Sequence, residues 1–199
     1  MELDPGTLSA GRAYQWMISI ITPRPIAWVT TVSPDGIVNA APFSYFTGVG
    51  SQPPTLMFSV VNKPDGTKKD TLRNIESTGE FVVNVVPHEL GQLMFETSHE
   101  FPYGVSELER VGLATIPSHR VRPPGIAQSP VQLECRTLQI VCIGDGALAA
   151  HAVFGEITWM RIEDRLLNEA GEIDSERLDT IGRMGGRTYT RTRDRFKLT

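Results

Sequence analysis

Cysteine is scarce in this chain, which contains only Cys135 and Cys142 among 199 residues. The two are an odd number of positions apart in one predicted strand, so their side chains should point to opposite faces and not pair easily. Neither has a CxxC spacing or a histidine nearby. We therefore expect two buried, apolar thiols rather than a disulfide, a redox pair or a zinc site.

The sequence also lacks the common motifs of metal and nucleotide chemistry. Its four histidines show no HxH or HExxH spacing, so no metal site is predicted. There is no GxSxG elbow, no GxxxxGK[ST] loop and no GxGxxG fingerprint, and the glycines at 182, 185 and 186 have the wrong spacing for a dinucleotide fold. These absences argue against metallohydrolases, α/β-hydrolases, P-loop enzymes and Rossmann folds.

Positive charge and long apolar runs are missing as well. With 19 basic and 23 acidic residues the formal net charge is -4, which offers no basic field for nucleic acid. No apolar run approaches the ~20 residues that span a bilayer, and residues 1–12 lack the basic and apolar regions of a signal peptide. We expect a cytoplasmic protein without membrane or nucleic-acid partners, folded as a single domain over residues 1–199.

A β-hairpin with an unusual second arm is the most informative stretch. Residues 26–32 are β-branched and aromatic, residues 33–36 have turn composition, and residues 37–41 can return alongside. The return arm then runs through Asn39 to Phe46, where small residues alternate with amide, hydroxyl and aromatic groups. Such a surface suits a planar ligand with polar edges.

Strand signals dominate the rest of the chain. Strands are predicted at residues 55–61, 80–86, 131–143 and 147–162, with a weaker one at 116–121 and a bend or bulge at Gly155. Residues 139–143 should be the more buried end of their strand. Residues 48–54 are predicted to form a loop. Residues 88–112 are predicted to form two helical pieces separated by a break at 101–104, and residues 14–21 fit either a strand or a short helix. The pattern predicts a mainly β fold, a barrel with a few peripheral helices.

A helix start with two lysines follows the third strand. Thr67 or Asp70 can cap it, Gly79 should end it, and Lys68 to Thr71 place cations where backbone N–H groups are free. An anion site is one interpretation, and a solvated helix start with ordinary surface lysines is the other. Three segments together suit a ligand with a flat polar ring and a phosphate, such as a flavin. They are this helix start, the second arm of the hairpin at residues 39–46, and a Gly/Arg/Tyr segment at residues 182–189.

Four segments carry a resemblance to a known family. PRPIAWVTTVSPDGIVNAAPFSYF, SQPPTLMFSV, KDTLRNI with GEFVVNVV, and IGRMGGRTY are similar to the flavin reductase-like family of FMN-binding split-barrel proteins, which includes flavoredoxin. The resemblance implies a six-stranded antiparallel split barrel. It also implies a homodimer with FMN near the subunit interface, and electron transfer from NAD(P)H.

The resemblance also implies the flavin contacts. Its PRPIA motif would lie beside the flavin, with Thr30 and Thr31 toward the ribityl and phosphate groups. Lys69 and Thr71 would hold the phosphate, and Tyr189 would either approach the ring or pack in the barrel or interface. The full set of expected cofactor contacts is Arg24, Pro25, Ile26, Ala27, Thr30, Thr31, Asn39, Ala41, Pro42, Phe43, Ser44, Phe46, Lys69, Thr71, Arg183 and Tyr189.

The implied activity is that of an NAD(P)H-dependent flavin reductase, in which FMN passes electrons to free flavin, oxygen, an acceptor protein or an oxygenase. No catalytic side chain is expected, because the redox chemistry belongs to the cofactor. Two alternatives stay open: a flavoredoxin-type electron carrier that does not oxidise NAD(P)H, and a split-barrel binding protein without cofactor. The sequence leaves open NADH against NADPH, and FMN against FAD.

Overall fold

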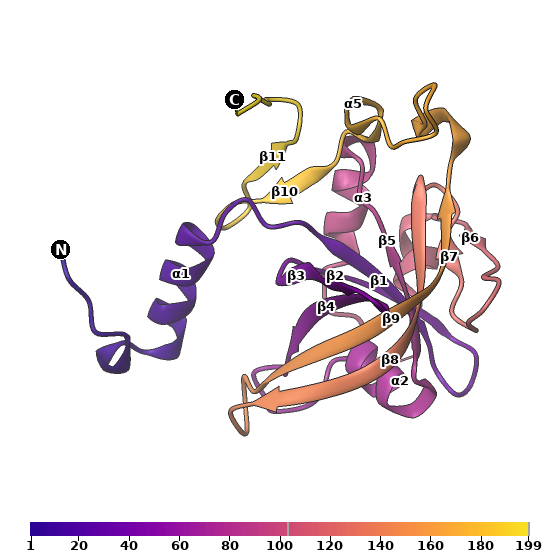
Figure 1. The fold of residues 1–199 in the computed structure, drawn as a ribbon. Helices are drawn as coiled ribbons and strands as arrows, with labels where there is room; N and C mark the ends of the chain where they lie inside the picture. Colours follow the sequence, from indigo (N-terminus) through magenta and orange to yellow (C-terminus); the bar gives the residue numbers. More distant parts are fainter. Residues whose placement is uncertain (103, 199) are drawn as a thin grey trace.

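Seven antiparallel strands form one sheet in the order β2-β1-β5-β8-β9-β4-β3 (Figure 1). The computed structural model describes residues 1–102 and 104–198. The strands of the sheet are β1 (Ala27–Val32), β2 (Val38–Phe43), β3 (Phe46–Ser51), β4 (Pro54–Val61), β5 (Glu80–Asn84), β8 (Val131–Ile143) and β9 (Ala150–Ile162). Two small ribbons pair β6 (Thr115–Ile116) with β7 (Gly125–Ile126), and β10 (Ile181–Arg183) with β11 (Tyr189–Arg191).

The helices are short and lie around this sheet. They are α1 (Ala10–Ile20), α2 (Asp70–Thr78), α3 (Gly91–Glu96), α4 (Glu107–Val111) and α5 (Ser175–Leu178), with 3-10 turns at Pro5–Thr7, His88–Leu90 and Asp164–Leu166. Helix α1 extends away from the barrel, whereas α2 and α3 lie against it (Figure 1). Within the described residues, no helix combines the length and apolar character needed to cross a membrane.

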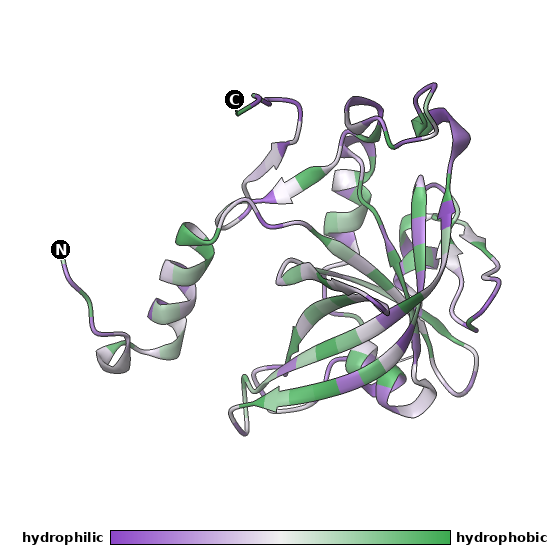
Figure 2. Ribbon diagram, viewed as in Figure 1, coloured by the Kyte–Doolittle hydropathy of each residue, from purple (hydrophilic) through white to green (hydrophobic). Residues whose placement is uncertain are grey.

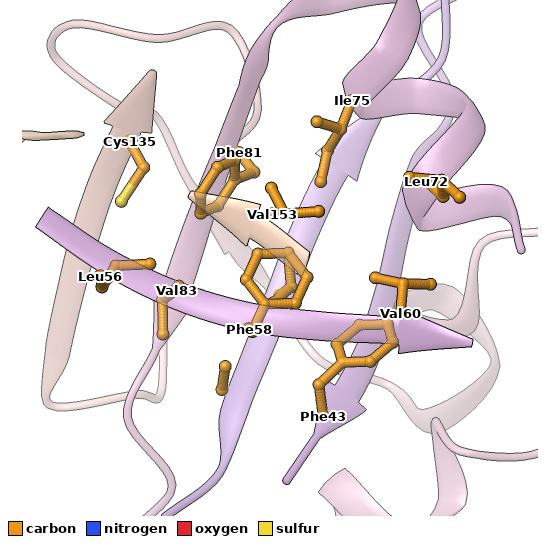
Figure 3. Packing of buried hydrophobic residues seen from close by; sticks show 12 residues of the cluster. Phe43, Leu56, Phe58, Val60, Leu72, Ile75, Phe81, Val83, Cys135 and Val153 are labelled. Carbon is orange, nitrogen blue, oxygen red and sulfur yellow. The ribbon is translucent and has the colours of Figure 1, made fainter. Parts of the chain in front are cut away.

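One core fills the inside of the curled sheet. Phe58 lies at its centre, with its ring centroid 5.2 Å from that of Phe43 and 5.3 Å from that of Phe81 (Figure 3). Phe43 belongs to β2 and Phe58 to β4, so strands from opposite ends of the sheet order meet in one cluster. The sheet therefore curls into a barrel, and helix α2 closes it with Leu72 and Ile75.

A second core lies on the outer face of β1 and β2. Trp28 is fully buried there among residues of α3, α4 and β10, and its Nε1 donates to Oγ1 of Thr97 at 2.9 Å. Strand β1 is consequently buried on both faces, which explains why residues 27–32 do not alternate between apolar and polar. In Figure 2 the strands of the sheet show hydrophobic residues interspersed with paler ones.

Much of the predicted architecture is confirmed. The hairpin pairs β1 with β2, and Gly36 in its turn has a φ of +88° that a residue with a side chain rarely adopts. The predicted mainly β, antiparallel fold with a few helices is observed, and helix α2 ends at Gly79 with a φ of +70°. Residues 14–21, left open between strand and helix, lie mostly in α1, where Ser9 accepts a bond from the N–H of Arg12.

Several local predictions are wrong. The sheet has seven strands rather than six, because residues 48–51, predicted as part of a loop, belong to strand β3, which pairs with β4; only residues 52 and 53 form the turn between them. Glycine has low strand propensity, but an edge strand is held by backbone hydrogen bonds that need no side chain. The strand predicted at 116–121 is only the two-residue β6. Tyr103, in the break predicted at 101–104, lies outside the described residues.

The β8–β9 ribbon also departs from expectation at its outer end. Residues 139–143 were predicted to be the more buried part, yet Ile143 is 62% exposed, because the ribbon extends past the barrel (Figure 1). Cys142 lies on this end and is exposed, so the prediction of a buried thiol is confirmed for Cys135 and wrong for Cys142. Both cysteines are free, as expected.

Gly155 marks an irregularity in the same ribbon, as predicted. The register shifts beside it, between Thr137 and Gln139, so the extra residue belongs to the partner strand β8. A Cβ at position 155 would lie 2.3 Å from Cζ of Phe81. The glycine therefore leaves the space that this core ring occupies.

Candidate functional site

A narrow pocket of about 110 Å³ opens at the N-terminal end of α2. Strand β2, the start of α2 and the segment 97–101 surround it. Its lining residues are Asn39, Ala41, Pro42, Lys63, Lys69, Asp70, Thr71, Thr97, Ser98, His99, Glu100, Phe101 and Glu107. Binding sites for whole drug-sized ligands measure about 300–1,000 Å³, so this volume suits a phosphate-sized group and not a complete flavin.

Lys69 places an ammonium group at the pocket, whose lining also includes Lys63 and the carboxylates of Asp70, Glu100 and Glu107. It occupies the N-cap position of α2 without a capping side-chain bond, so the N–H groups of the first turn are left for a ligand. The prediction that Thr67 or Asp70 caps this helix is wrong, because Lys69 is the N-cap residue. The N–H and the hydroxyl of Thr67 bond to Asp65 instead. Free N–H groups, a helix dipole and an ammonium group at one point favour an anion.

The two lysines of the helix start face different surroundings. Lys68 is exposed and its Nζ lies 2.7 Å from Oε1 of Glu76, on the outside of the helix. Lys69 is half-buried and forms no ion pair with a carboxylate among the described residues. Burial lowers the pKa of Lys69, Glu100 opposes this effect and Lys63 adds to it. A desolvated ammonium group without a carboxylate partner gains most from an anionic ligand.

A buried chain of polar groups supports the pocket from behind. Asn39 is at its centre: Nδ2 donates to Oε1 of Glu107 at 2.6 Å, and Oδ1 accepts from Oγ1 of Thr71 at 2.9 Å and of Thr31 at 3.3 Å. Asn74 Nδ2 in turn donates to Thr31 Oγ1 at 3.0 Å. The chain ties β1, β2, α2 and α4 together, which fixes the Thr71 side chain at the pocket wall.

Arg24 anchors a second group of predicted residues. Its guanidinium is buried and donates to the carbonyls of Ile18 at 2.8 Å, Ile21, and Met184 at 2.7 Å, while Nε lies 3.4 Å from Oγ of Ser44. Its backbone N–H donates to the Arg183 carbonyl at 2.9 Å, and its own carbonyl accepts from the Arg183 N–H at 2.8 Å. Arg24 therefore joins α1, the residue after β2, and β10.

Arg183 and Tyr189 lie next to that junction. Nη1 of Arg183 donates to the hydroxyl of Tyr189 at 2.9 Å, and its Cζ lies 5.0 Å from the ring centroid. Tyr189 also packs against the second core, which fits the packing role left open for it in the sequence. A contact of either residue with flavin stays a prediction.

The remaining predicted residues are mostly turned inward. Ala27, Phe43 and Phe46 belong to or pack against the barrel core, and Ile26 lies in the second core. The side chains of Ala27, Phe43 and Ile26 are buried, so only their backbone groups are available to a ligand, whereas Phe46 is partly exposed and Pro25 is exposed.

Thr30 and Thr31 point to opposite faces of β1. Thr30 donates to the carbonyl of Pro124 at 2.6 Å and accepts from Asn84, away from the pocket. Thr31 supports Asn39 instead, so the structure brings only one of the two threonines to the polar chain.

Sequence reasoning missed Glu107, Lys63 and the segment 97–101. Glu107 stands in the charged stretch SELER, where a carboxylate normally faces solvent, and nothing local distinguishes it from Glu109. Residues 97–101 follow a short helix and show no ligand-binding pattern. Their place at the pocket depends on contacts between segments far apart in the chain.

Strand β2 connects the two groups of residues. It is the first strand in the sheet order and pairs with β1. On its other side the N–H of Ala40 is bonded to Glu107 and Pro42 has no N–H, so mainly C=O groups are left there. From Asn39 to Ser44 an extended backbone covers roughly 17 Å at about 3.4 Å per residue. The arrangement suits an elongated ligand with an anion at Lys69 and a polar, flat group along β2 toward Arg24.

Comparisons with known proteins agree on one family. The model of the family described as "Flavin reductase like domain" matches residues 19–177. An uncharacterized protein of Aquifex aeolicus is 41% identical over 197 residues, covering 99% of this chain and 96% of that one. The structure of nitrilotriacetate monooxygenase component B from Bacillus cereus is 30% identical, with a TM-score of 0.94 and coverage of 100% and 98%. That of 2-nitrobenzoate 2-nitroreductase NbaA from Pseudomonas fluorescens is 32% identical, with a TM-score of 0.90 and coverage of 100% and 95%.

Proposed function

Because the chain belongs to the family of flavin reductase-like domains, we propose that it is an FMN-binding oxidoreductase that takes its electrons from NAD(P)H. The observation that carries the proposal is the half-buried Lys69, which has no ion pair among the described residues and lies at the uncapped N-terminus of α2, beside the edge strand β2. Bound FMN would supply the hydride-accepting chemistry, so the chain needs no nucleophile or metal of its own.

The residues present fit such a cofactor. Lys69 and the first-turn N–H groups of α2 would hold the phosphate, with Thr71 at the same wall of the pocket. Backbone groups of Ala41 to Ser44 on β2 would meet the polar edge of the ring. A pocket of about 110 Å³ has room for the phosphate end alone, so the ring would lie along the open side of β2.

The small volume of the pocket, which would leave the flavin ring uncovered, supports a homodimer in which a second copy of the chain covers the ring. Helix α1 extends from the barrel and exposes Tyr14, Met17 and Ile20, the last with 72% of its surface accessible (Figure 1). An apolar helix face of this kind is costly in water and suits burial against another copy. Sedimentation equilibrium should give twice the 22.0 kDa chain mass, and Met17→Asp with Ile20→Asp should shift it to the monomer and weaken FMN binding. A monomer that binds FMN normally would contradict the dimer.

The acceptor belongs to one of two classes that the related structures suggest. One relative is a component of a monooxygenase and the other a nitroreductase, by their names. Electrons from this protein would accordingly pass to an oxygenase partner or acceptor protein, or to a small oxidant such as free flavin, oxygen or a nitroaromatic compound.

Anaerobic spectroscopy tests the proposal. Purified protein loaded with FMN should show flavin absorbance, which should bleach when NADH or NADPH is added. Absorbance that persists with both nucleotides, while a reduced acceptor protein still bleaches it, would replace the reductase with an electron carrier. Colourless protein that fails to bind FMN in a titration would indicate a split-barrel binding protein, and the proposed function would be wrong.

A further inference from the structure

The carboxylate of Glu107 is buried at the wall of the pocket beside the start of α2. Only 6% of the residue is exposed, and its two oxygens accept from Asn39 Nδ2 at 2.6 Å and from the Ala40 N–H at 2.9 Å. No ion pair joins it to a lysine or arginine in the part of the chain that the structure describes. A charge held in this way is costly, so its hydrogen-bond partners determine its state.

The orientation of the Asn39 amide determines which way the Thr71 hydroxyl donates its hydrogen bond. An amide side chain has one donating end and one accepting end. Because Nδ2 is bonded to Glu107, Oδ1 faces Thr71 and accepts the single hydroxyl hydrogen of that residue at 2.9 Å. Thr71 then offers only lone pairs to the pocket. A fully ionised phosphate group also offers only acceptors, so this arrangement gives it no hydrogen bond from the Thr71 hydroxyl.

A neutral Glu107 permits the reverse arrangement. Its O–H would donate to Oδ1 of Asn39 once that amide turns over, and the two Nδ2 hydrogens would meet the oxygens of Thr71 and Thr31. The hydroxyl hydrogen of Thr71 is then free to point into the pocket. With an ionised carboxylate, the turned amide would bring two acceptor oxygens together at the present 2.6 Å contact, which is repulsive.

We propose that Glu107 is a positioning residue of the anion site, and that its protonation decides through Asn39 whether the Thr71 hydroxyl donates to Asn39 or to a bound phosphate. The inference rests on the proposed binding of FMN and concerns the phosphate end of that site. Burial raises the pKa of Glu107, the bonds from Ala40 and Asn39 lower it, and Asp70 raises it further, so the neutral form is favoured relative to an exposed glutamate. The other charged or titratable groups at the pocket are Lys63, Lys69, His99 and Glu100.

Glu107→Gln tests the inference, because its amide can donate to Asn39 and still accept from Ala40 at every pH. At pH 8 we expect the ratio of FMN to riboflavin affinity, measured by flavin fluorescence quenching, to rise about tenfold over the wild type. The matched control Glu109→Gln, exposed on the same helix, should leave the ratio unchanged. Toward pH 5.5 the FMN to riboflavin affinity ratios of the wild type and Glu107→Gln should become more similar. Because the phosphate of FMN titrates in the same way with both proteins, its titration does not affect this comparison.

The role of Thr71 separates this inference from simple charge removal. In a Thr71→Val background, Glu107→Gln should no longer change the FMN to riboflavin ratio. The inference would be overturned if Glu107→Gln left the ratio of FMN to riboflavin affinity unchanged or lowered it. It would also be overturned if Glu107→Gln raised this ratio equally in the Thr71→Val background. In both cases FMN binding itself would persist. A wild type that binds neither flavin would instead overturn the proposed function.

A second measurement covers the case in which Glu107→Gln does not fold. Thr71→Val in the wild-type background should cost little FMN affinity at pH 8 and progressively more as the pH falls and Glu107 becomes protonated, toward about tenfold relative to wild type at the same pH. An equal cost at every pH would show that Thr71 donates regardless of Glu107, and the inference would be wrong.

Discussion

Lys69→Ala should lower the affinity for FMN by about 1.5–3 kcal/mol, which is roughly tenfold or more. The half-buried ammonium group of Lys69 has no ion pair with a carboxylate among the described residues and lies at the free N-terminus of α2. Removing it takes away one charge-assisted contact with the phosphate. Titration of the FMN-free protein, followed by flavin fluorescence, measures the change.

Riboflavin and a neighbouring lysine provide the controls for this variant. Riboflavin lacks the phosphate, so its affinity should be the same for Lys69→Ala and the wild type. Lys68 is exposed and paired with Glu76 on the outer side of α2, so Lys68→Ala should bind FMN nearly as the wild type does. Equal losses for FMN and riboflavin, or an unchanged FMN affinity, would place the phosphate elsewhere.

Arg24→Ala should destabilise the FMN-free protein by about 2–4 kcal/mol, because three carbonyl groups lose their donor together. The carbonyls of Ile18 and Ile21 lie at the C-terminal end of helix α1. Backbone acceptors there lack intrahelical partners, and a cation is favourable. The third carbonyl, of Met184, belongs to the segment after β10. Denaturant unfolding without FMN measures the loss free of any ligand contribution.

Hydrogen exchange shows whether the loss is local to α1. In Arg24→Ala, the amides of residues 10–20 should exchange faster than in the wild type, because the C-terminal end of the helix is no longer tied to the barrel. Arg12→Ala is the matched control: this arginine is exposed on the same helix and should leave both stability and exchange nearly unchanged. A stability change below about 0.5 kcal/mol would assign Arg24 to ligand binding alone.

The two variants separate functions that the sequence motif joins. In the family motif, Arg24 and Lys69 both stand as flavin contacts, yet the guanidinium of Arg24 is engaged with the protein's own backbone. Its loss is expected to affect folding of the site's surroundings, whereas the loss of Lys69 is expected to affect the phosphate alone. Measuring stability and FMN affinity for both variants distinguishes the two roles.

The fold could be predicted because its signals are local. Turn residues such as Gly36, β-branched runs and the glycine at the end of α2 act over a few residues, so the hairpin, the main strands and α2 follow from the sequence. The edge strand β3 could not be predicted in this way. Its glycine-rich residues carry little propensity, and pairing with β4 alone holds them extended.

The mainly β split barrel and the family could be inferred from the sequence alone, and Lys69 and Thr71 are its prediction for an anion site at a helix start. Which groups share the pocket depends on the tertiary structure. It turned Thr30 away from Thr31, buried Glu107 against Asn39, and gave the guanidinium of Arg24 to backbone carbonyls. The physical reason is that a side chain's environment depends on contacts between segments distant in the chain, such as α4 on β2, which no local pattern encodes.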